Sequence, residues 1–287
     1  MVRLTVLGSG SSGNCAVVST DHSTVLIDAG LSAKQICLRL AAAGFSADTL
    51  DAVLLTHEHQ DHTGGLQVLC RKRNIPLYCT ALTQETLATS LDFRSPPAWK
   101  IMPNGGAFEF RDLRIECFSV PHDAVDPVGF VICDEESRLG VLSDVGFVTN
   151  LIKERLRHAD SLFIEANYDA QLLEADTRRP WSTKQRISSR HGHLSNDQAA
   201  ELVEEIAHPG LHHVLLGHLS DDCNCPVRAQ RRIQESLHKA GIRETRVLCA
   251  ERHRPTPTVE VARRRAAVSF CMANASAPVV HQQLALF

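Results

Sequence analysis

The sequence predicts an α/β fold of the α+β type, built on mixed β-sheet that helices cover on its outer faces. Three observations support this prediction. Short apolar runs of strand character alternate with helix-like segments along most of the chain. Consecutive hairpin-like strands occur at the start and again around residues 113–142, which predicts antiparallel pairing. Helices between the later strands then predict a mixed sheet with covered outer faces.

The elements follow from the apolar runs and from the signals that end them. We expect strands at residues 4–7, 16–19, 24–27, 52–55, 77–79, 113–120, 128–133, 139–142, 161–164, 213–216 and 246–249. We expect helices at residues 32–43, 65–73, 83–90, 149–157, 196–207 and 226–240. Gly44 and Gly241 supply the stop signals of the first and the last of these helices. No internal repeat of fixed short period is present.

Composition limits the class of protein. The 287 residues suffice for one large domain or two small ones, and an apolar content of 44% supports a globular core. A net charge of −3 gives no global electrostatic footprint for nucleic acid, so any such binding must come from a local patch. We expect no membrane contact, because no apolar run approaches the roughly 20 residues that span a bilayer. The N-terminus also lacks a signal-peptide pattern.

The cysteines and the C-terminal composition add two expectations. Ten cysteines, most of them within apolar runs, are typical of a reducing cytosol, so we expect a cytoplasmic protein. Cys223 and Cys225 are the one close pair, and a single intervening residue is a poor zinc spacing that favours a structural role. From about Arg254 the chain is rich in Pro, Arg, Ala and Ser without a convincing period. We therefore expect a hydrolase domain over residues 1–253 and a flexible tail over residues 254–287.

Four potential metal ligands lie within six residues. His57, His59, Asp61 and His62 come directly after the apolar run 52–56, which is typical of a buried strand. Imidazole nitrogen and carboxylate oxygen suit Zn, Mn or Fe in the +2 state. If the chain leaves the strand extended and then bends, one short loop can serve two adjacent metal ions. The alternative is a polar surface loop that happens to be rich in histidine, and such a cluster after a buried strand has no packing purpose.

Three further strands deliver a potential ligand at their C-terminal ends. His122 follows the strand at 113–120, Asp144 follows 139–142, and His218 follows 213–216. A single histidine at a strand end is more often a structural residue than a ligand. Three such ends beside a histidine-rich loop predict a metal site instead.

The combined set resembles the full ligand set of the metallo-β-lactamase superfamily, over about residues 2–250. The resemblance implies a four-layer αβ/βα sandwich of two mixed β-sheets flanked by helices, with two divalent metal ions at one edge between the sheets. It also implies the ligands: His57, His59 and His122 on one metal, Asp61, His62 and His218 on the other, and Asp144 bridging. Asp28 matches the superfamily's first motif, which implies hydrogen bonds that orient the histidine loop. The alternative for Asp28 is an ordinary turn residue.

The charge of such a site narrows the substrate. Five neutral imidazoles and two carboxylates around two divalent cations leave a formal charge of +2, or +1 with a bridging hydroxide. We therefore expect an anionic substrate, above all a phosphodiester, and a metal-activated water. A bridging carboxylate at Asp144 and the lack of a cysteine ligand argue against a genuine β-lactamase.

Several stretches are similar to one branch, the YycJ/WalJ family of bacterial metallo-hydrolases, which is linked to DNA exonuclease activity. They are the Gly/Ser-rich loop at 7–15, LIDAGLS at 26–32, VPHDAVDP at 120–127, and the segments 180–187 and 192–196. Taken alone, the Gly/Ser-rich loop could equally bind phosphate or form a hairpin turn.

Glu165 and His193 are, with Asp61, the candidate catalytic residues. Glu165 follows the strand at 161–164, and His193 precedes Ser195, which opens a helix with a capping-box signature. Because a helix N-terminus attracts anions, we expect phosphate near His193 and Ser195. Similarity to RNase Z implies that His193 is a general acid or phosphate clamp and that Glu165 holds its ring. The alternatives are a helix-entry residue for His193 and a buried salt-bridge partner for Glu165.

Residues 178–190 carry five basic side chains and no acidic one. Such a run is usually a solvated face, but beside a metal site it could contact phosphates. Lys184 and Arg186 are the expected nucleic-acid contacts. We expect Trp181 in the core, with stacking on a base as the alternative.

The final residues, Gln283, Leu284, Ala285, Leu286 and Phe287, resemble the pentapeptide that docks bacterial polymerases and repair proteins on the replication sliding clamp. Leu284, Leu286 and Phe287 would fill apolar pockets while Gln283 satisfies polar groups at the rim. A tether of about 25 residues would reach roughly 30 Å. The alternative is an apolar tail that packs on its own domain.

We therefore expect a cytoplasmic, two-metal phosphodiesterase that acts on DNA rather than RNA, as an exonuclease of repair or replication. Two alternatives remain. One is a small-molecule hydrolase of thioesters or cyclic phosphodiesters, against which the basic stretch and the terminal motif weigh. The other is a non-catalytic regulator that binds the clamp, which the complete ligand set disfavours.

Overall fold

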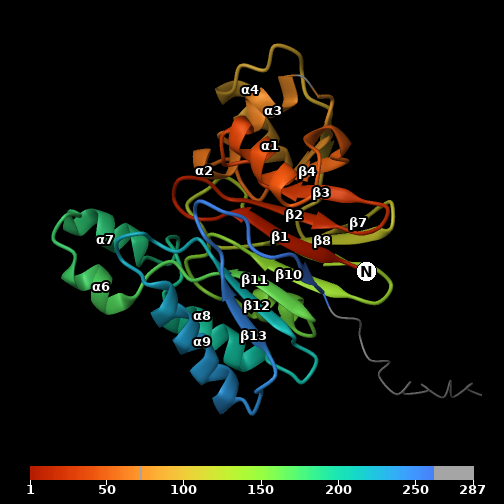
Figure 1. Ribbon diagram of the computed structural model, residues 1–287. Coiled ribbons are helices and arrows are strands. Elements are labelled where there is room, and N and C mark those ends of the chain that lie inside the picture. Colours follow the sequence, from red (N-terminus) through yellow and green to blue (C-terminus); the bar gives the residue numbers. More distant parts are fainter. Residues whose placement is uncertain (72, 262–287) are drawn as a thin grey trace, which may run out of the picture.

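Two seven-stranded β-sheets pack face to face in the computed structural model, which describes residues 1–71 and 73–261. Helices cover the outer face of each sheet, so the layers run helix, sheet, sheet, helix (Figure 1). Both sheets are mixed. The expected fold class, two mixed sheets flanked by helices, is confirmed.

The first sheet has the strand order β14-β1-β2-β3-β4-β5-β6. Its pairs are antiparallel from β14 to β3 and parallel from β3 to β6. Its strands are β1 (Arg3–Gly8), β2 (Cys15–Ser19), β3 (Thr24–Ile27), β4 (Ala52–Leu54), β5 (Leu77–Cys79), β6 (Trp99–Ile101) and β14 (Val259–Glu260).

The second sheet has the order β13-β12-β11-β10-β9-β8-β7. Its pairs are antiparallel from β7 to β10 and parallel from β10 to β13. Its strands are β7 (Ala107–Phe110), β8 (Leu113–Ser119), β9 (Val128–Cys133), β10 (Arg138–Leu142), β11 (Ser161–Glu165), β12 (His213–Gly217) and β13 (Arg246–Cys249).

Several helices begin directly after a serine or threonine that acts as the N-cap. Ser32, Thr149 and Ser195 each accept a hydrogen bond from a backbone N–H of the first turn that follows. The helices of the described residues are α1 (Ala33–Ala42), α2 (Gln60–Thr63), α3 (Leu66–Arg71), α4 (Ala81–Ser90), α5 (Asn150–Leu156), α6 (Ala170–Ala175), α7 (Trp181–Ile187), α8 (Asn196–Ile206) and α9 (Pro226–Lys239), with a 3₁₀ turn, η1 (Ala47–Thr49).

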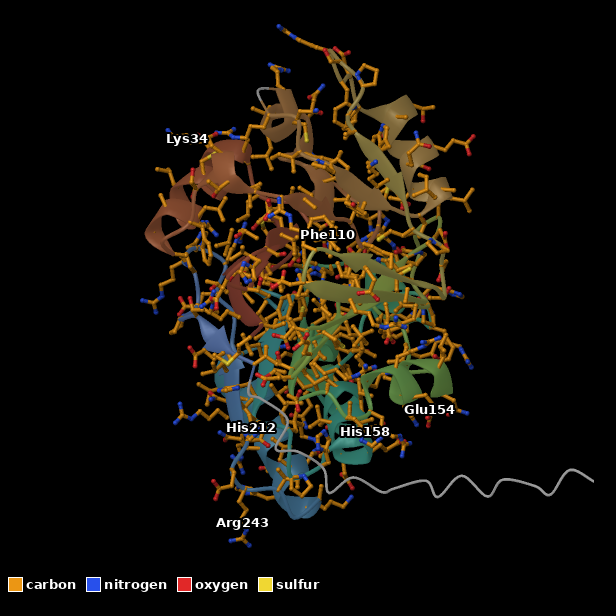
Figure 2. All side chains as sticks on the ribbon, turned by 90° about the vertical axis from the view of Figure 1, so that its right-hand side faces the viewer. Lys34, Phe110, Glu154, His158, His212 and Arg243 are labelled. Carbon is orange, nitrogen blue, oxygen red and sulfur yellow. The ribbon has the colours of Figure 1, made fainter. Side chains whose placement is uncertain are left out.

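Three apolar layers hold the sandwich together. One lies between the sheets and includes Leu4, Ile115 and Phe130, all fully buried. The second lies between the first sheet and α1 and α3, and the third between the second sheet and α5, α8 and α9. In Figure 2, Lys34 on α1 and Glu154 on α5 mark the outer helix layers.

The carboxyl ends of the parallel strands lie at one edge of the sandwich and carry the candidate site residues there. In the first sheet β3 and β4 run parallel, and in the second β10, β11 and β12 do. The carboxyl ends of parallel strands meet at the same edge of a sheet, where ligands usually bind. Each of these five strands is followed within three residues by, or ends on, a candidate site residue.

The strands and helices that the sequence analysis expected are all present, within about two residues of the expected bounds. Of the elements it did not identify, α2 lies at the site and carries Asp61 and His62, and most of the others lie at the periphery. β6 and β14 are the edges of the first sheet and β7 is an edge of the second. α7 has no buried residue and α6 has only Leu173. Elements that bury little apolar surface leave little apolar periodicity to read.

Ordered structure continues past the domain end that was expected at residue 253. β14 pairs antiparallel with β1, and the backbone N–H groups of Thr256 and Val261 donate to the carbonyls of Val6 and Val2, both at 2.9 Å. A two-residue edge strand that follows Pro255 and Pro257 is too short to show an alternating pattern, which is why the sequence did not reveal it. Residues 262–287 lie outside the described residues.

Among the residues that the structure describes, no helix combines the length and the apolar character needed to cross a lipid bilayer.

Candidate metal centre

All seven expected metal ligands converge at the edge of the sandwich. The ligand atoms of His57, His59, His122 and Asp144 lie within 4.8 Å of one another. The same holds for a second group, which shares Asp144 and adds Asp61, His62 and His218. The two groups come from the loop after β4, from α2, and from the segments that follow β8, β10 and β12.

The imidazole tautomers of the first group are set from outside the cluster. Thr56 Oγ1 donates to Asp28 Oδ2 at 2.9 Å, so it can accept from His57 Nδ1 at 3.0 Å. His122 Nδ1 donates to the carbonyl of Gly192 at 3.0 Å, and His59 Nε2 donates to that of Asp123 at 3.2 Å. In each histidine the second ring nitrogen remains as an acceptor that faces the cluster.

The second group is prepared in the same way. His62 Nδ1 donates to Asp28 Oδ2 at 2.7 Å, and His218 Nδ1 lies 2.9 Å from Glu165 Oε1. Their Nε2 atoms approach carboxylates, with His62 Nε2 3.3 Å from Asp144 Oδ2 and His218 Nε2 3.3 Å from Asp61 Oδ2. Each of the five imidazoles thus has one ring nitrogen bonded outside the cluster and the other facing the carboxylates of Asp61 and Asp144.

The donor set fits divalent transition metals. His57 Nε2 is buried, and within the described part of the chain it has no hydrogen-bond partner; it lies 3.8 Å from Asp144 Oδ2. An orphaned buried nitrogen costs free energy unless a further group binds it. A cation between the ligand atoms would satisfy it, and imidazole with carboxylate suits Zn, Mn or Fe.

The electrostatics of the cluster favour cations. Burial alone would raise the pKa of Asp144, but His218 and His62 outweigh it and hold that pKa well below the usual range. Burial also opposes protonation of His218, yet Asp144, Asp61 and Glu165 raise its pKa to about 10. Burial lowers the pKa of His57. A carboxylate this deeply buried stays ionised because positive charge lies beside it.

Asp28 supports the histidine loop as expected for a residue outside the ligand set. Its Oδ1 accepts from the Thr56 N–H at 2.9 Å, and its Oδ2 accepts from both Thr56 Oγ1 and His62 Nδ1. The carboxylate is 2% exposed, so these contacts are not shared with solvent. Asp28 thereby fixes the ring nitrogens of His57, through Thr56, and of His62.

Three of the site residues hold an unusual backbone conformation. Asp28, Asp144 and His218 have φ of 60°, 50° and 53°, in the left-handed region. For residues other than glycine this region costs about 1–2 kcal/mol. Each residue comes just after a strand, where the chain must turn sharply to present its side chain at the edge. Strain of this kind gathers at functional sites.

The Gly/Ser-rich loop between β1 and β2 contributes a residue that the sequence analysis missed. Asn14 Oδ1 accepts from Ser9 Oγ and from the N–H of Gly10, both at 2.9 Å, which orients its Nδ2 toward the cluster. Nδ2 lies 3.1 Å from His62 Nε2 and 3.4 Å from Asp61 Oδ2. The sequence analysis interpreted this loop as a hairpin turn or a phosphate-binding loop, and neither interpretation predicted a contact with the ligand cluster. The one sequence signal for it is the polar side chain of Asn14 at the end of the loop.

Glu165 and His193 form the expected pair. His193 Nδ1 lies 2.6 Å from Glu165 Oε1, and Glu165 Oε2 accepts from the N–H groups of Val145 and Leu194 at 2.9 and 3.2 Å. Burial acts to lower the pKa of His193, but the Glu165 carboxylate raises it above its ordinary value. The His193 ring lies 5.3 Å from that of His122 and 5.0 Å from that of His218, measured between centroids. His193 therefore sits beside both ligand groups.

The three residues expected to contact nucleic acid differ in their exposure and in the partners that already bind their side chains. Arg186 is 70% exposed and pairs with Asp123 at 2.6 Å, next to His122. Lys184 Nζ donates to the carbonyl of Glu174 at 2.7 Å. Ser195 Oγ accepts from the Gln198 N–H at 3.2 Å in a complete capping box, so its hydroxyl serves the start of α8.

Trp181 contradicts the expectation of a core residue, because it is 69% exposed. It opens α7, a helix that lies outside both sheets and buries no side chain. Figure 1 shows α6 and α7 projecting beyond the sandwich.

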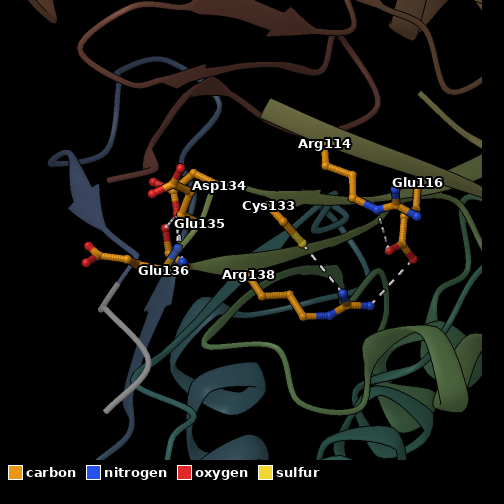
Figure 3. A pocket seen from close by; sticks show the side chains of 8 residues that line it. Arg114, Glu116, Cys133, Asp134, Glu135, Glu136 and Arg138 are labelled. Carbon is orange, nitrogen blue, oxygen red and sulfur yellow. Dashed lines mark hydrogen bonds and ion pairs between the residues drawn. The ribbon is translucent and has the colours of Figure 1, made fainter. Parts of the chain in front are cut away.

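A surface pocket lies at the other end of the strands, around the turn between β9 and β10 (Figure 3). The ligand cluster follows the opposite end of β10, so the pocket is separate from it. The pocket is lined by Arg114, Glu116, Cys133, Asp134, Glu135, Glu136, Ser137 and Arg138.

Comparison with known proteins agrees with this geometry. The β-lactamase superfamily domain matches residues 23–218, which include every residue of the cluster. The chain belongs to the metallo-β-lactamase superfamily. It is 32% identical to the exodeoxyribonuclease YycJ of Bacillus anthracis over 240 residues, which cover 84% of this chain and 90% of the relative. It is 35% identical to the exodeoxyribonuclease WalJ of Streptococcus pneumoniae over 242 residues, with the same coverage. The expected YycJ/WalJ membership is confirmed.

Solved structures share the fold of this superfamily member. YhfI from Bacillus subtilis has a TM-score of 0.66 at 16% identity, covering 89% of this chain and 99% of its own. The short form of human tRNase Z has a TM-score of 0.62 at 17% identity, covering 91% and 99%. Family membership and the convergent histidine and aspartate ligands together identify a metal-dependent hydrolase.

Proposed function

We propose that this superfamily member is an exodeoxyribonuclease that hydrolyses phosphodiester bonds of DNA, in repair or replication. The observation that carries the proposal is the convergence of seven ligands in two groups joined by Asp144, in a chain whose relatives YycJ and WalJ are named exodeoxyribonucleases. Both of these relatives match over most of the chain, which favours this activity over the small-molecule and regulator alternatives.

The ligands divide between two metal ions in this proposal. His57, His59 and His122 bind one, and Asp61, His62 and His218 bind the other, with Asp144 shared. The two spatial groups and the outward-fixed tautomers support this division. When bound, the ions would supply Lewis-acid activation of water and charge compensation for the phosphodiester. Zn, Mn and Fe all suit these ligands.

In this proposal, side chains around the two metal ions hold the ligands and the phosphate in place and supply a proton to the leaving oxygen. Glu165 holds His193 through Nδ1 and raises its pKa, so His193 Nε2 is suited to donate a proton to the leaving oxygen of the scissile phosphate. Asn14 Nδ2, fixed by Ser9 and Gly10, orients the Asp61 carboxylate. Arg186 borders the site beside Asp123, where a phosphate can compete for its guanidinium, and Lys184 lies two residues before it on α7. Ser195 also stays in the proposal as a phosphate contact, because its Oγ accepts the capping hydrogen bond of α8 and its O–H can still donate.

The test is degradation of end-labelled single- and double-stranded DNA by the purified chain, reconstituted with Zn, Mn or Fe in turn. We expect loss of end label with at least one metal, and loss of that activity in His59→Ala and Asp61→Ala. An RNA of the same sequence tests the preference for DNA. Turnover by the two variants that matched the unmodified chain would refute the proposal.

We also propose that residues 283–287 dock on a bacterial sliding clamp. The support is the pentapeptide pattern of Gln283, Leu284, Leu286 and Phe287 in a protein proposed to act on DNA. Binding of the full chain to an immobilised clamp should be lost on Phe287→Ala, because that side chain would fill an apolar pocket. Equal binding of variant and unmodified chain would contradict it. We further propose a cytoplasmic location, which the nine free thiols of the described residues support.

A further inference from the structure

The Gly/Ser-rich loop between β1 and β2 (residues 9–14) contacts only one of the two ligand groups. Ser9 and Asn14 form hydrogen bonds with every ligand that belongs to the second group alone, namely Asp61, His62 and His218. Within the part of the chain that the structure describes, no hydrogen bond joins this loop to the ligands of the first group alone, which are His57, His59 and His122. The loop therefore belongs to the surroundings of the second group.

Ser9 connects the loop, which joins two strands of the first sheet, to His218 at the end of a strand of the second sheet. Ser9 Oγ accepts from the His218 N–H at 2.7 Å and donates to Asn14 Oδ1 at 2.9 Å. Asn14 Oδ1 also accepts from the N–H of Gly10 at 2.9 Å, so the amide cannot turn over without losing both bonds. The NH₂ group of Asn14 is therefore held toward the ligands.

Asn14 holds Asp61 at two points. The backbone N–H of Asn14 donates to the Asp61 carbonyl at 2.7 Å, and its Nδ2 lies 3.4 Å from Asp61 Oδ2. Nδ2 also lies 3.1 Å from His62 Nε2. When a cation takes the lone pair of His62 Nε2, the Asp61 carboxylate remains as the acceptor of the Asn14 amide. Ser9 and Asn14 are each 5% exposed, so solvent does not compete for these hydrogen bonds.

The glycines of the loop allow this close approach. Gly10 and Gly13 have φ of 141° and 150°, which glycine adopts far more readily than other residues. A Cβ at Gly13 would lie 2.8 Å from the carbonyl of Gly30, whose N–H donates to the Asn14 carbonyl at 2.9 Å. The glycines thus let the backbone of Asn14 lie against Gly30 and Asp61.

We propose that Ser9 and Asn14 are positioning residues for the second metal ion alone, so that the Gly/Ser-rich loop sets the affinity of that ion and not of the first. The first group has supports of its own in Thr56, Asp123 and Gly192. Partners that orient metal ligands typically contribute about 10- to 100-fold to metal affinity. The inference rests on the proposed division of the ligands between two metal ions and adds which part of the chain holds one of them.

The test measures each ion separately, in backgrounds that keep one ligand group complete. His59→Ala removes a ligand of the first group, and His218→Ala removes a ligand of the second. Competition with a chromophoric chelator for Zn²⁺ or Mn²⁺ then gives the Kd of the ion at the complete group. In the His59→Ala background, Ser9→Ala and Asn14→Ala should each raise that Kd about 10- to 100-fold. In the His218→Ala background they should change it less than about twofold.

Ser12→Ala makes the same chemical change as Ser9→Ala in the same loop, at an exposed hydroxyl that accepts from Arg252 Nε at 2.6 Å, and it should leave both Kd values unchanged. Thermal unfolding of the metal-free variants checks that they fold. Equal weakening of both ions, or no weakening of the second, would overturn the inference. DNA plays no part in the measurement, so a chain without nuclease activity that lost the second ion selectively would count against the proposed function and still support the inference.

Discussion

Replacing Asp28 by Asn tests how the histidine loop is prepared for metal. The carboxylate accepts three hydrogen bonds, from the Thr56 N–H, Thr56 Oγ1 and His62 Nδ1. An amide keeps one oxygen. If that oxygen faces the Thr56 N–H, the new NH₂ faces His62 Nδ1 and favours the tautomer with a protonated Nε2, which cannot bind a cation. If the amide is reversed, its NH₂ opposes the Thr56 N–H. Either orientation loses a contact.

The size of the effect follows from the contact that is lost. A hydrogen bond to a charged group contributes about 1.5–3 kcal/mol, which corresponds to a roughly 10- to 150-fold weaker metal Kd. Loss of a partner that orients a metal-binding histidine typically costs 10- to 100-fold. Asn tolerates a φ of 60° nearly as well as Asp does, so the substitution adds little backbone strain.

The assay is competition for Zn²⁺ or Mn²⁺ between the protein and a chromophoric chelator. Asp21→Asn makes the same chemical change at a carboxylate whose side chain is 74% exposed, and it serves as the control. Thermal unfolding of the metal-free variants checks that both fold. A Kd for Asp28→Asn within twofold of the control would refute the tautomer argument.

Three further predictions follow from other parts of the structure. Glu165→Gln and His193→Ala should each slow DNA hydrolysis about 100-fold, and the double variant should lose less than the product of the two, because Glu165 acts in part through His193 and in part through His218; fully additive losses would contradict this. In Gly30→Ala the new Cβ would lie 1.7 Å from the Asp61 carbonyl oxygen, so the free energy of unfolding should fall by about 1–3 kcal/mol in a urea titration, whereas Gly210→Ala should change it little. Burial acts to raise the pKa of Asp134, but hydrogen bonds from Ser137 outweigh it and lower that pKa to about 2 (Figure 3). This stabilisation is present above pH 4 and lost as pH falls toward 2, so Asp134→Asn should cost about 1 kcal/mol at pH 7 and almost nothing at pH 2, with Glu135→Gln as the control.

The sequence was informative wherever apolar surface is buried on a regular period. Leu54, Val141 and Leu216 belong to runs whose alternating or continuous apolar pattern marks a strand, and each run ends at a ligand. The ligands could be located because chemistry needs them at strand ends and in one short loop. The order of the strands and their division between two sheets came only with the resemblance to a family.

What could not be predicted depends on contacts between distant parts of the chain. Asn14 contacts residues 47 and 48 positions away, and nothing near it in sequence indicates them. The exposure of Trp181 also went against expectation, because a large aromatic side chain is usually buried and α7 is too short to show periodicity. β14 is held by pairing with β1, at the opposite end of the chain.

The central claim is that seven side chains bind a pair of divalent cations, and elemental analysis of the reconstituted chain tests it most directly. We predict two transition-metal ions per chain after dialysis, and fewer in Asp144→Ala, because both ligand groups share that carboxylate. A chain that binds no transition metal after reconstitution with Zn, Mn or Fe, or an Asp144→Ala variant that still binds two, would contradict the claim.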